Sequence, residues 1–163
     1  MSPENPASLP QSPAVPESER PSGGAVSVGI VLVSHSQALA EAALDLARRL
    51  IVAVDVPVEL AAGLADGGLG TDPGAVVEAV ERLAERCEGV LVLADLGSGI
   101  MSAEMALEML DPALAERTRL SAAPFVEGLL GAYGAAGIGK DLQAVAAEAD
   151  GAAEAKRSQV AAF

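Results

Sequence analysis

From residue 26 onward, the apolar positions of the chain alternate between two patterns, one typical of strands and one typical of helices. Short apolar runs rich in β-branched residues predict strands at residues 26–33, 57–61, 89–94 and 118–122. Apolar residues at helical spacing predict helices at 37–51, at 73–86, after residue 99, from 125 to the mid-130s, and at 140–155. Strands that alternate with helices form parallel sheets with right-handed crossovers. The pattern therefore predicts an α/β fold, a small doubly wound parallel sheet flanked by helices.

Two of the predicted helices carry large apolar side chains in a stripe. In the helix at 37–51 the stripe consists of Leu39, Ala43, Leu46 and Leu50, and Ser36 is a plausible N-terminal cap. In the helix after residue 99 the stripe consists of Met101, Met105 and Met109. Because methionine fills irregular gaps in hydrophobic cores, we expect the three methionines to be buried.

The first 24 residues differ in composition from the rest of the chain. They contain six of the ten prolines, together with Ser, Glu, Asn and Gly. Such a segment cannot bury enough apolar surface to offset its chain entropy, so it is predicted to be a disordered tail. Residues 25–155 form one predicted domain with enough apolar content for a core, and residues 156–163 are predicted to be a C-terminal tail.

The charge of the chain restricts its possible partners. The formal net charge is −13, and the ten Lys and Arg residues form no cluster. Nucleic acids and anionic membrane surfaces are therefore excluded as partners, and we expect a protein partner that presents arginines. The single Cys87 is predicted to be a small core residue, since it has no second cysteine for a disulfide and no zinc-site spacing. With no leader-like segment and no apolar run approaching ~20 residues, the chain is expected to be cytoplasmic.

The only histidine, His35, directly follows the first predicted strand. In open α/β sheets, ligands bind beyond the carboxyl ends of the strands, so His35 is the first candidate for chemistry. A lone histidine is more often structural, but three loops leave this edge of the predicted sheet and carry polar residues among glycines. They are Ser34-His35-Ser36, Leu69-Gly70-Thr71-Asp72 and Asp95-Leu96-Gly97-Ser98-Gly99. Glycine amides and helix N-termini bind phosphate oxygens, so these loops together predict a phosphate pocket around an imidazole.

Each residue of this pocket has a predicted role. A carboxylate such as Asp95, bonded to one ring nitrogen, would leave the other nitrogen of His35 free to attack phosphorus. The hydroxyls of Ser98 and Thr71 and the backbone amides of Gly97 and Ser98 could hold the phosphoryl oxygens. Ser36 is a further candidate phosphate contact. No metal ligand set and no cofactor are needed.

Structural roles remain open for several of these residues. Asp95 could end a strand or cap a helix, and Thr71 and Asp72 could cap the helix that begins near Pro73. For Asp72 we favour the capping role.

Three near-miss motifs do not support other chemistry. Residues 134–141 resemble a nucleotide P-loop, but Asp141 replaces the hydroxyl residue and no strand precedes the segment. Gly97-Ser98-Gly99 resembles a dinucleotide-binding loop, but Ser102 occupies the position of the third glycine. The same segment is not a Gly-x-Ser-x-Gly nucleophile elbow, because Leu96 occupies its first position.

Four segments in order give the chain a family resemblance over about residues 26–150. They are residues 29–36, residues 69–71, residues 93–98 with Met101 and 104–107, and residues 123–128. With these motifs the chain resembles the DhaM family, the phosphoryl-carrier subunits of phosphoenolpyruvate-dependent dihydroxyacetone kinase. That family is related to the mannose-type enzyme IIA domains. The last segment favours the dihydroxyacetone branch over the sugar-transport branch.

The resemblance implies a function for the site. His35 would accept a phosphoryl group from the phosphocarrier protein HPr and pass it to ADP held on a partner kinase subunit, which then phosphorylates dihydroxyacetone. Asp95 would orient the ring, and Thr71, Gly97 and Ser98 would contact phosphate. The resemblance also implies a homodimer and a sheet of order 2-1-3-4.

Some family members carry fused HPr-like and enzyme I-like domains, which we expect this chain to borrow from separate proteins. Two positions depart from the family pattern, with Ser102 in place of asparagine and Asp72 in place of serine. Three alternatives stay open: a mannose-type sugar-transport enzyme IIA subunit, a non-catalytic regulator with this fold, and a nucleotide-binding enzyme. The sequence leaves open which ring nitrogen is modified, where partners dock and how a dimer is arranged.

Overall fold

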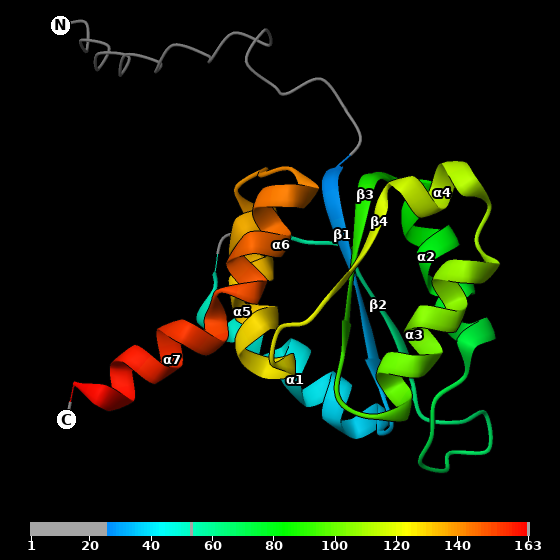
Figure 1. The fold of residues 1–163 in the computed structure, drawn as a ribbon, viewed down its shortest axis with the longest axis horizontal. Coiled ribbons are helices and arrows are strands. Elements are labelled where there is room, and N and C mark those ends of the chain that lie inside the picture. Colours follow the sequence, from blue (N-terminus) through cyan, green and yellow to red (C-terminus); the bar gives the residue numbers. More distant parts are fainter. Residues whose placement is uncertain (1–25, 53, 163) are drawn as a thin grey trace, which may run out of the picture.

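A four-stranded parallel sheet lies between two groups of helices in the computed structural model, which describes residues 26–52 and 54–162 (Figure 1). The strands are β1 (Val26–Ser34), β2 (Val58–Ala62), β3 (Cys87–Ala94) and β4 (Thr118–Ser121). Their order in the sheet is β2-β1-β3-β4 and every pairing is parallel. The predicted fold class and strand order are confirmed. The predicted N-terminal tail lies outside the described residues.

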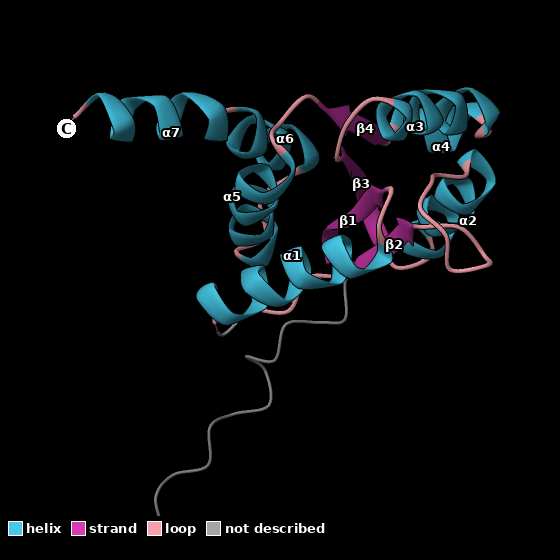
Figure 2. Cartoon of the chain, turned by 90° about the horizontal axis from the view of Figure 1, so that it is seen from below, coloured by secondary structure: helices cyan, strands magenta, loops and turns pink. Residues whose placement is uncertain are grey.

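The helices cover both faces of the sheet (Figure 2). On one face lie α1 (Gln37–Leu50), α5 (Phe125–Gly137) and α6 (Leu142–Asp150). On the other face lie α2 (Pro73–Ala84), α3 (Ser98–Met109) and α4 (Pro112–Glu116). The last helix, α7 (Ala152–Ala161), extends away from this three-layer body. Within the described part of the chain, no helix has the length and apolar character needed to cross a membrane.

Successive side chains of β1 point alternately into two hydrophobic cores, one on each face of the sheet. Ile30 and Leu32 point into the core beneath α1, α5 and α6, whereas Val31 and Val33 point into the core beneath α2 and α3. All four side chains are fully buried. Since successive side chains of a strand point to opposite faces, a central strand covered on both sides must be apolar at every position. This is why the sequence of β1 predicts its place in the fold.

The structure differs from the predicted elements chiefly in three places. The helix predicted at 140–155 is two helices that meet at Gly151, and residues 156–161, predicted to be tail, belong to α7. The short helix α4 was not predicted, although Asp111 caps it and Pro112 occupies its first turn. Strand β3 begins two residues before the predicted start, at Cys87, which is buried as expected.

Helix α1 buries only Ala43 of the predicted stripe. Its leucines Leu39, Leu46 and Leu50 are 43%, 40% and 63% exposed. The buried positions of α1 are Ala40, Ala43, Leu44 and Ala47. Because the α1 side facing the core consists mostly of alanines, its backbone lies close to the layer below and the larger side chains remain outside.

Helix α3 shows the same arrangement, and the prediction that its methionines are core residues is wrong. Met101, Met105 and Met109 are 61%, 52% and 59% exposed. The buried face of α3 consists of Gly99, Ser102, Ala103 and Ala106. Small side chains allow this helix to pack closely on the sheet, and the methionines therefore face away from it.

Candidate active site

The register of the sheet brings His35 and Asp95 together. Val33 of β1 pairs with Ala94 of β3, and the Asp95 N–H donates to the Val33 carbonyl at 3.0 Å. Strand β2 lies on one side of β1, and the later strands β3 and β4 lie on its other side. The strand order therefore reverses between β1 and β3, the strands that carry His35 and Asp95 at their ends. Ligand sites of doubly wound sheets lie at this point, outside the carboxyl ends of the strands.

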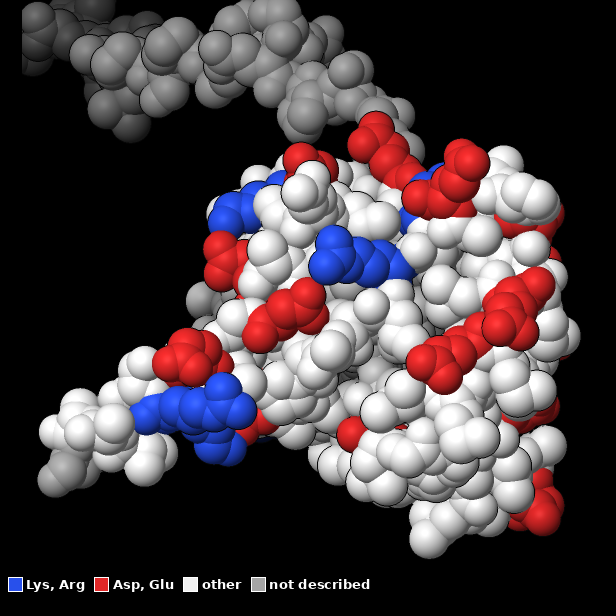
Figure 3. Space-filling model, in the orientation of Figure 1, with Lys and Arg blue, Asp and Glu red and all other residues white. Residues whose placement is uncertain are grey.

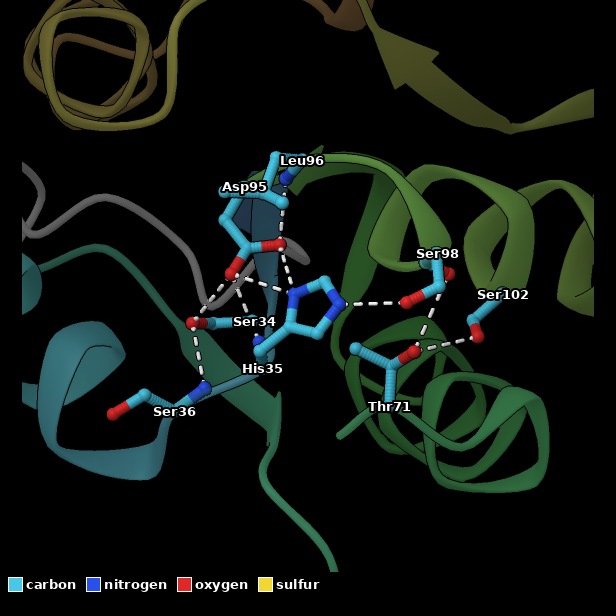
Figure 4. A network of polar contacts seen from close by, with 8 residues as sticks. All are labelled: Ser34, His35, Ser36, Thr71, Asp95, Leu96, Ser98 and Ser102. Atoms are coloured by element: carbon cyan, nitrogen blue, oxygen red, sulfur yellow. Dashed lines mark hydrogen bonds and ion pairs between the residues drawn. The ribbon is translucent and has the colours of Figure 1, made fainter. Parts of the chain in front are cut away.

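Asp95 holds the His35 ring by one nitrogen (Figure 4). The Nδ1 atom lies 2.9 Å from Oδ1 and 3.1 Å from Oδ2 of Asp95. An ionised carboxylate can only accept hydrogen bonds, so Nδ1 carries the proton and Nε2 keeps its lone pair. The side chain of Asp95 is 5% exposed and that of His35 is 28% exposed, which leaves the ring reachable from solvent.

Several donors stabilise the charge of Asp95. Burial by itself raises the pKa of this carboxyl, but the hydrogen bonds outweigh it and lower the pKa below the ordinary value of 3.8. The backbone N–H groups of His35 and Leu96 donate at 2.9 and 2.6 Å, and the hydroxyl of Ser34 donates at 3.0 Å. Asp95 is therefore an anion at neutral pH, placed behind the imidazole.

Ser34 lies in one of the predicted pocket loops, but the sequence analysis assigned it no role. Its side chain is fully buried, donates to Asp95 Oδ2 and accepts from the Ser36 N–H at 3.1 Å. One hydroxyl thus connects the end of β1, the carboxylate and the start of α1. The available signal was a serine that ends a central, otherwise apolar strand, where burial requires a hydrogen-bond partner.

The free side of the ring faces the start of α3. Ser98 Oγ lies 2.6 Å from His35 Nε2, the distance of a hydroxyl that donates to the ring lone pair. Gly97 precedes the helix with a φ of 47°, which a glycine adopts without strain. Neither the Gly97 nor the Ser98 N–H donates to another described residue. Of the candidate contacts, Ser98 therefore lies next to Nε2, and Gly97 directly precedes it at the N-terminus of α3.

The Thr71 side chain holds the first turns of α3 by two hydrogen bonds. Its hydroxyl donates to the Ser98 carbonyl at 3.3 Å and accepts from the Ser102 hydroxyl at 2.8 Å. It makes no hydrogen bond to the ring itself. The loop that carries Thr71 is held close because the Gly70 N–H donates to the His35 carbonyl at 2.9 Å.

Ser36 and Asp72 act as helix caps. The Ser36 hydroxyl accepts from the Leu39 N–H at 3.2 Å, and the Asp72 carboxylate accepts from the Gly74 N–H at 2.8 Å. Both capping predictions are confirmed. A phosphate contact of Ser36 stays a prediction.

Gly99 is a second residue of the predicted pocket loops to which the sequence analysis assigned no role. A Cβ atom at this position would lie 2.6 Å from Asp95 Oδ1 and 3.6 Å from His35 Cε1. The first distance is shorter than any non-bonded contact allows. Only glycine therefore lets the first turn of α3 approach the carboxylate and the ring.

The P-loop resemblance at residues 134–141 has no support in the fold. Gly134 and Gly137 lie within α5, so this part of the motif is helical and follows no strand. The polar groups around His35 form one site: a ring nitrogen with a lone pair, an anion behind the ring and a hydroxyl beside it. This set defines an α/β protein with a partly exposed, carboxylate-paired histidine at the switch point of its sheet.

Comparison with known proteins agrees with this class. Residues 29–146 match the family model of EIIA-man, described as the PTS system fructose IIA component. The chain is 44% identical over 135 residues to the protein from Klebsiella michiganensis called PEP-dependent dihydroxyacetone kinase, phosphoryl donor subunit DhaM, and equally identical to that of Escherichia coli K12. The chain belongs to the EIIA-man family, in the branch formed by the DhaM phosphoryl donor subunits.

The matches differ in length. The first two relatives match 82% of this chain but only 28% of their own length, so the chain spans little more than a quarter of them. A DhaM of Listeria innocua is 38% identical over 101 residues, which are 79% of that protein. The crystal structure of EF1359, described as a protein of unknown function, superposes with a TM-score of 0.70 at 31% identity, covering 76% of this chain and 93% of the other.

Proposed function

We propose that this chain is a histidine phosphocarrier for dihydroxyacetone phosphorylation. His35 accepts a phosphoryl group from phosphorylated HPr and passes it to ADP bound on the nucleotide-binding subunit of dihydroxyacetone kinase. The observation that carries the proposal is the pairing of His35 Nδ1 with Asp95, which leaves Nε2 free beside the N-terminus of α3. The names of the DhaM relatives, which describe phosphoryl donor subunits, support the same role.

The proposed transfer forms one bond and breaks one. The lone pair of His35 Nε2 attacks phosphorus, and the phosphorus–nitrogen bond of the donor's phosphohistidine breaks, so that its electron pair returns to the donor ring. As the new bond forms, the His35 ring becomes cationic, because Nδ1 keeps its proton. The Asp95 carboxylate, 2.9 Å from Nδ1, stabilises that charge.

The other groups of the site serve the phosphoryl oxygens. Ser98 Oγ gives up its bond to Nε2 when phosphorus arrives and is free to donate to an oxygen. The N–H groups of Gly97 and Ser98 add two donors, and the N-terminus of α3 favours negative charge. In the second transfer, an oxygen of the ADP β-phosphate attacks the same phosphorus and the ring leaves with the electron pair.

The test is phosphorylation with purified components. The chain is incubated with phosphoenolpyruvate, enzyme I and HPr, and an acid-labile label is located by mass spectrometry. His35 is the only histidine, so a phosphohistidine can form nowhere else in the chain. We expect one phosphoryl group on His35 and none on the His35→Ala variant. A label elsewhere, or none on the wild type, would contradict the proposal.

The acceptor decides between the remaining functions. Phosphorylated chain is mixed either with the ADP-loaded kinase subunit or with a sugar-specific enzyme IIB domain. Transfer to the first supports the proposed role, and transfer to the second alone makes the chain a sugar-transport subunit. A non-catalytic regulator would not be labelled at all.

The proposal includes a homodimer, supported by the exposed leucines of α1. Leu39, Leu46 and Leu50 leave an apolar stripe along this helix. The charged residues of α1 lie on other faces of the helix, and Asp45 pairs with Arg49 at 2.7 Å. When two copies of α1 pack antiparallel about a two-fold axis, the leucine stripe of each covers that of the other and both are removed from water.

A further inference from the structure

The three exposed methionines of α3 form a ridge that the proposed chemistry does not use. This methionine ridge consists of Met101, Met105 and Met109, each more than half exposed. Ile100 and Leu96 add exposed apolar surface at the start of the helix, at 42% and 63%. Large apolar side chains gathered on one exposed helix face indicate an interaction surface.

The ridge is continuous with the reactive histidine. Residues 98, 101, 105 and 109 follow the spacing of one helix face, so Ser98 is the first member of the row that the methionines continue. The Ser98 hydroxyl contacts His35 Nε2. A protein that brings a phosphoryl group to Nε2 therefore approaches the end of this row.

The charged residues beside the ridge indicate what kind of partner fits it. Exposed Glu104 and Glu108 lie on α3 next to the methionines, and α3 contains no Lys or Arg. Figure 3 shows acidic side chains over α3 and no basic side chain there. A second copy docked on this ridge about a two-fold axis would bring like charges together, whereas a protein with basic residues around an apolar patch would find opposite charges.

We infer that the methionine ridge is the docking surface for the phosphorylated donor protein, which covers it with an apolar patch bordered by Arg or Lys. This inference rests on the proposed function. It adds the surface and the chemistry of the partner that fits it. Methionine side chains are flexible and polarisable, so the ridge can adapt to the shape of the docked protein.

The first experiment compares a ridge variant with a matched control. Met105→Glu places a charge in the middle of the ridge, where Met105 is 52% exposed, and Val160→Glu places one at an apolar position of α7, where Val160 is 69% exposed. The kcat/KM for phosphorylation of the chain by phosphorylated HPr should fall more than about tenfold in Met105→Glu. It should stay unchanged in Val160→Glu.

A small-molecule donor separates docking from chemistry. Phosphoramidate delivers a phosphoryl group to imidazole without protein contacts, so it should label His35 equally in the wild type and in Met105→Glu. Met105→Ala, which removes contact area without adding charge, should also lower kcat/KM for phosphorylated HPr. Equal kcat/KM values for the wild type and both Met105 variants would overturn the inference.

Charge reversal tests the basic border of the partner. Glu104→Arg combined with Glu108→Arg should slow association with HPr and remove much of its dependence on salt. An unchanged association rate would contradict a basic partner. Sedimentation of the Met105→Glu variant gives a further check, because a shift from dimer to monomer would assign the ridge to a second copy and overturn the inference.

The failure of the proposed function would give a different result. If neither phosphorylated HPr nor phosphoramidate labels the wild type, His35 is not a phosphocarrier. Calorimetric titration with unphosphorylated HPr then tests separately whether the methionine ridge is a docking surface. Weaker binding to Met105→Glu than to Val160→Glu supports the ridge, and equal or undetectable binding overturns it.

Discussion

The reactivity proposed for His35 depends on what contacts each of its two ring nitrogens. Nδ1 faces an anion whose charge is stabilised by backbone and serine donors, and Nε2 faces a hydroxyl at a helix start. An exposed histidine without these contacts would have no preferred tautomer. The residue type alone therefore does not account for the site.

Replacing Asp95 by Asn should preserve the shape of the site but remove its charge. The ring then loses both its fixed tautomer and the anion that stabilises the phosphorylated form. We expect the rate of phosphorylation by phosphorylated HPr to fall by roughly 10²-fold or more. Single-turnover labelling measures this rate, and a rate within about twofold of wild type would exclude an orienting role for Asp95.

The lowered pKa of Asp95 also makes its contribution to stability depend on pH. Because the pKa is lower in the folded chain than the ordinary value of 3.8, the folded state binds the proton less tightly than the unfolded state. The contribution is fully present above the ordinary pKa and is lost as the pH falls through the folded pKa.

Urea unfolding at a series of pH values measures this contribution. We expect the difference in unfolding free energy between wild type and Asp95→Asn to be constant near neutral pH and to shrink in acid below about pH 4. A difference that grew as the pH fell would show that the pKa is raised instead.

Substitution of Gly99 tests how strongly labelling depends on the positions of the site groups, because it removes no polar side chain. In Gly99→Ala, the new Cβ would lie 2.6 Å from Asp95 Oδ1, so the carboxylate or the helix must move. Displacement of a catalytic group by about 1 Å costs on the order of 10²-fold in rate, and we expect a loss of that order in labelling. Gly134→Ala is the matched control, since its Cβ would meet only Ile51 Cδ1 at 3.7 Å.

At the scale of elements, close packing decides which residues of a helix are buried. In α1 and α3 the small side chains face the sheet and most of the large apolar ones face solvent. A periodic stripe of leucine or methionine predicts the helix correctly but not its orientation. The exposed stripes are then free to form interfaces with other proteins.

The N-terminal cap of α1 should contribute measurably to stability. Ser36→Ala removes the acceptor of the Leu39 N–H and should lower the unfolding free energy by about 1 kcal/mol. Ser36→Asp, which restores an acceptor, should recover most of this loss in the same urea titration. A loss in Ser36→Ala that Asp does not recover would show that the hydroxyl acts in another way.

At the scale of the whole molecule, the two apolar stripes lie on opposite faces of the sheet, α1 on one and α3 on the other. A carrier that serves as a dimer and still exchanges phosphoryl groups with other proteins needs two separate surfaces. The proposed arrangement meets this need, because dimerisation through α1 leaves the methionine ridge uncovered.

Leu46→Glu tests the dimer surface. Two charges facing each other across the two-fold axis should convert the dimer to monomer, as measured by sedimentation over a range of concentrations. Phosphoramidate labelling of His35 should not change, because Leu46 is outside the site. If the variant and the wild type sediment alike, α1 does not form the interface.

The sequence by itself determined the strand order through the family resemblance, the buried central strand and the position of His35. The last two features follow from local patterns, because a strand covered on both faces must be apolar throughout and ligands of open α/β sheets bind beyond the carboxyl ends of the strands. The pairing of His35 with Asp95 also follows from two neighbouring parallel strands. The caps Ser36 and Asp72 are local in the same sense.

Only the tertiary structure decided which ring nitrogen is free, that Ser34 and Gly99 belong to the site, and that the methionines face outward. Each of these depends on contacts between residues far apart in the chain, such as Ser34 with Asp95 or Gly99 beside His35. Periodicity in a sequence gives the angle between side chains on one helix. It does not give the rotation of that helix against its neighbours, which close packing of small residues determines.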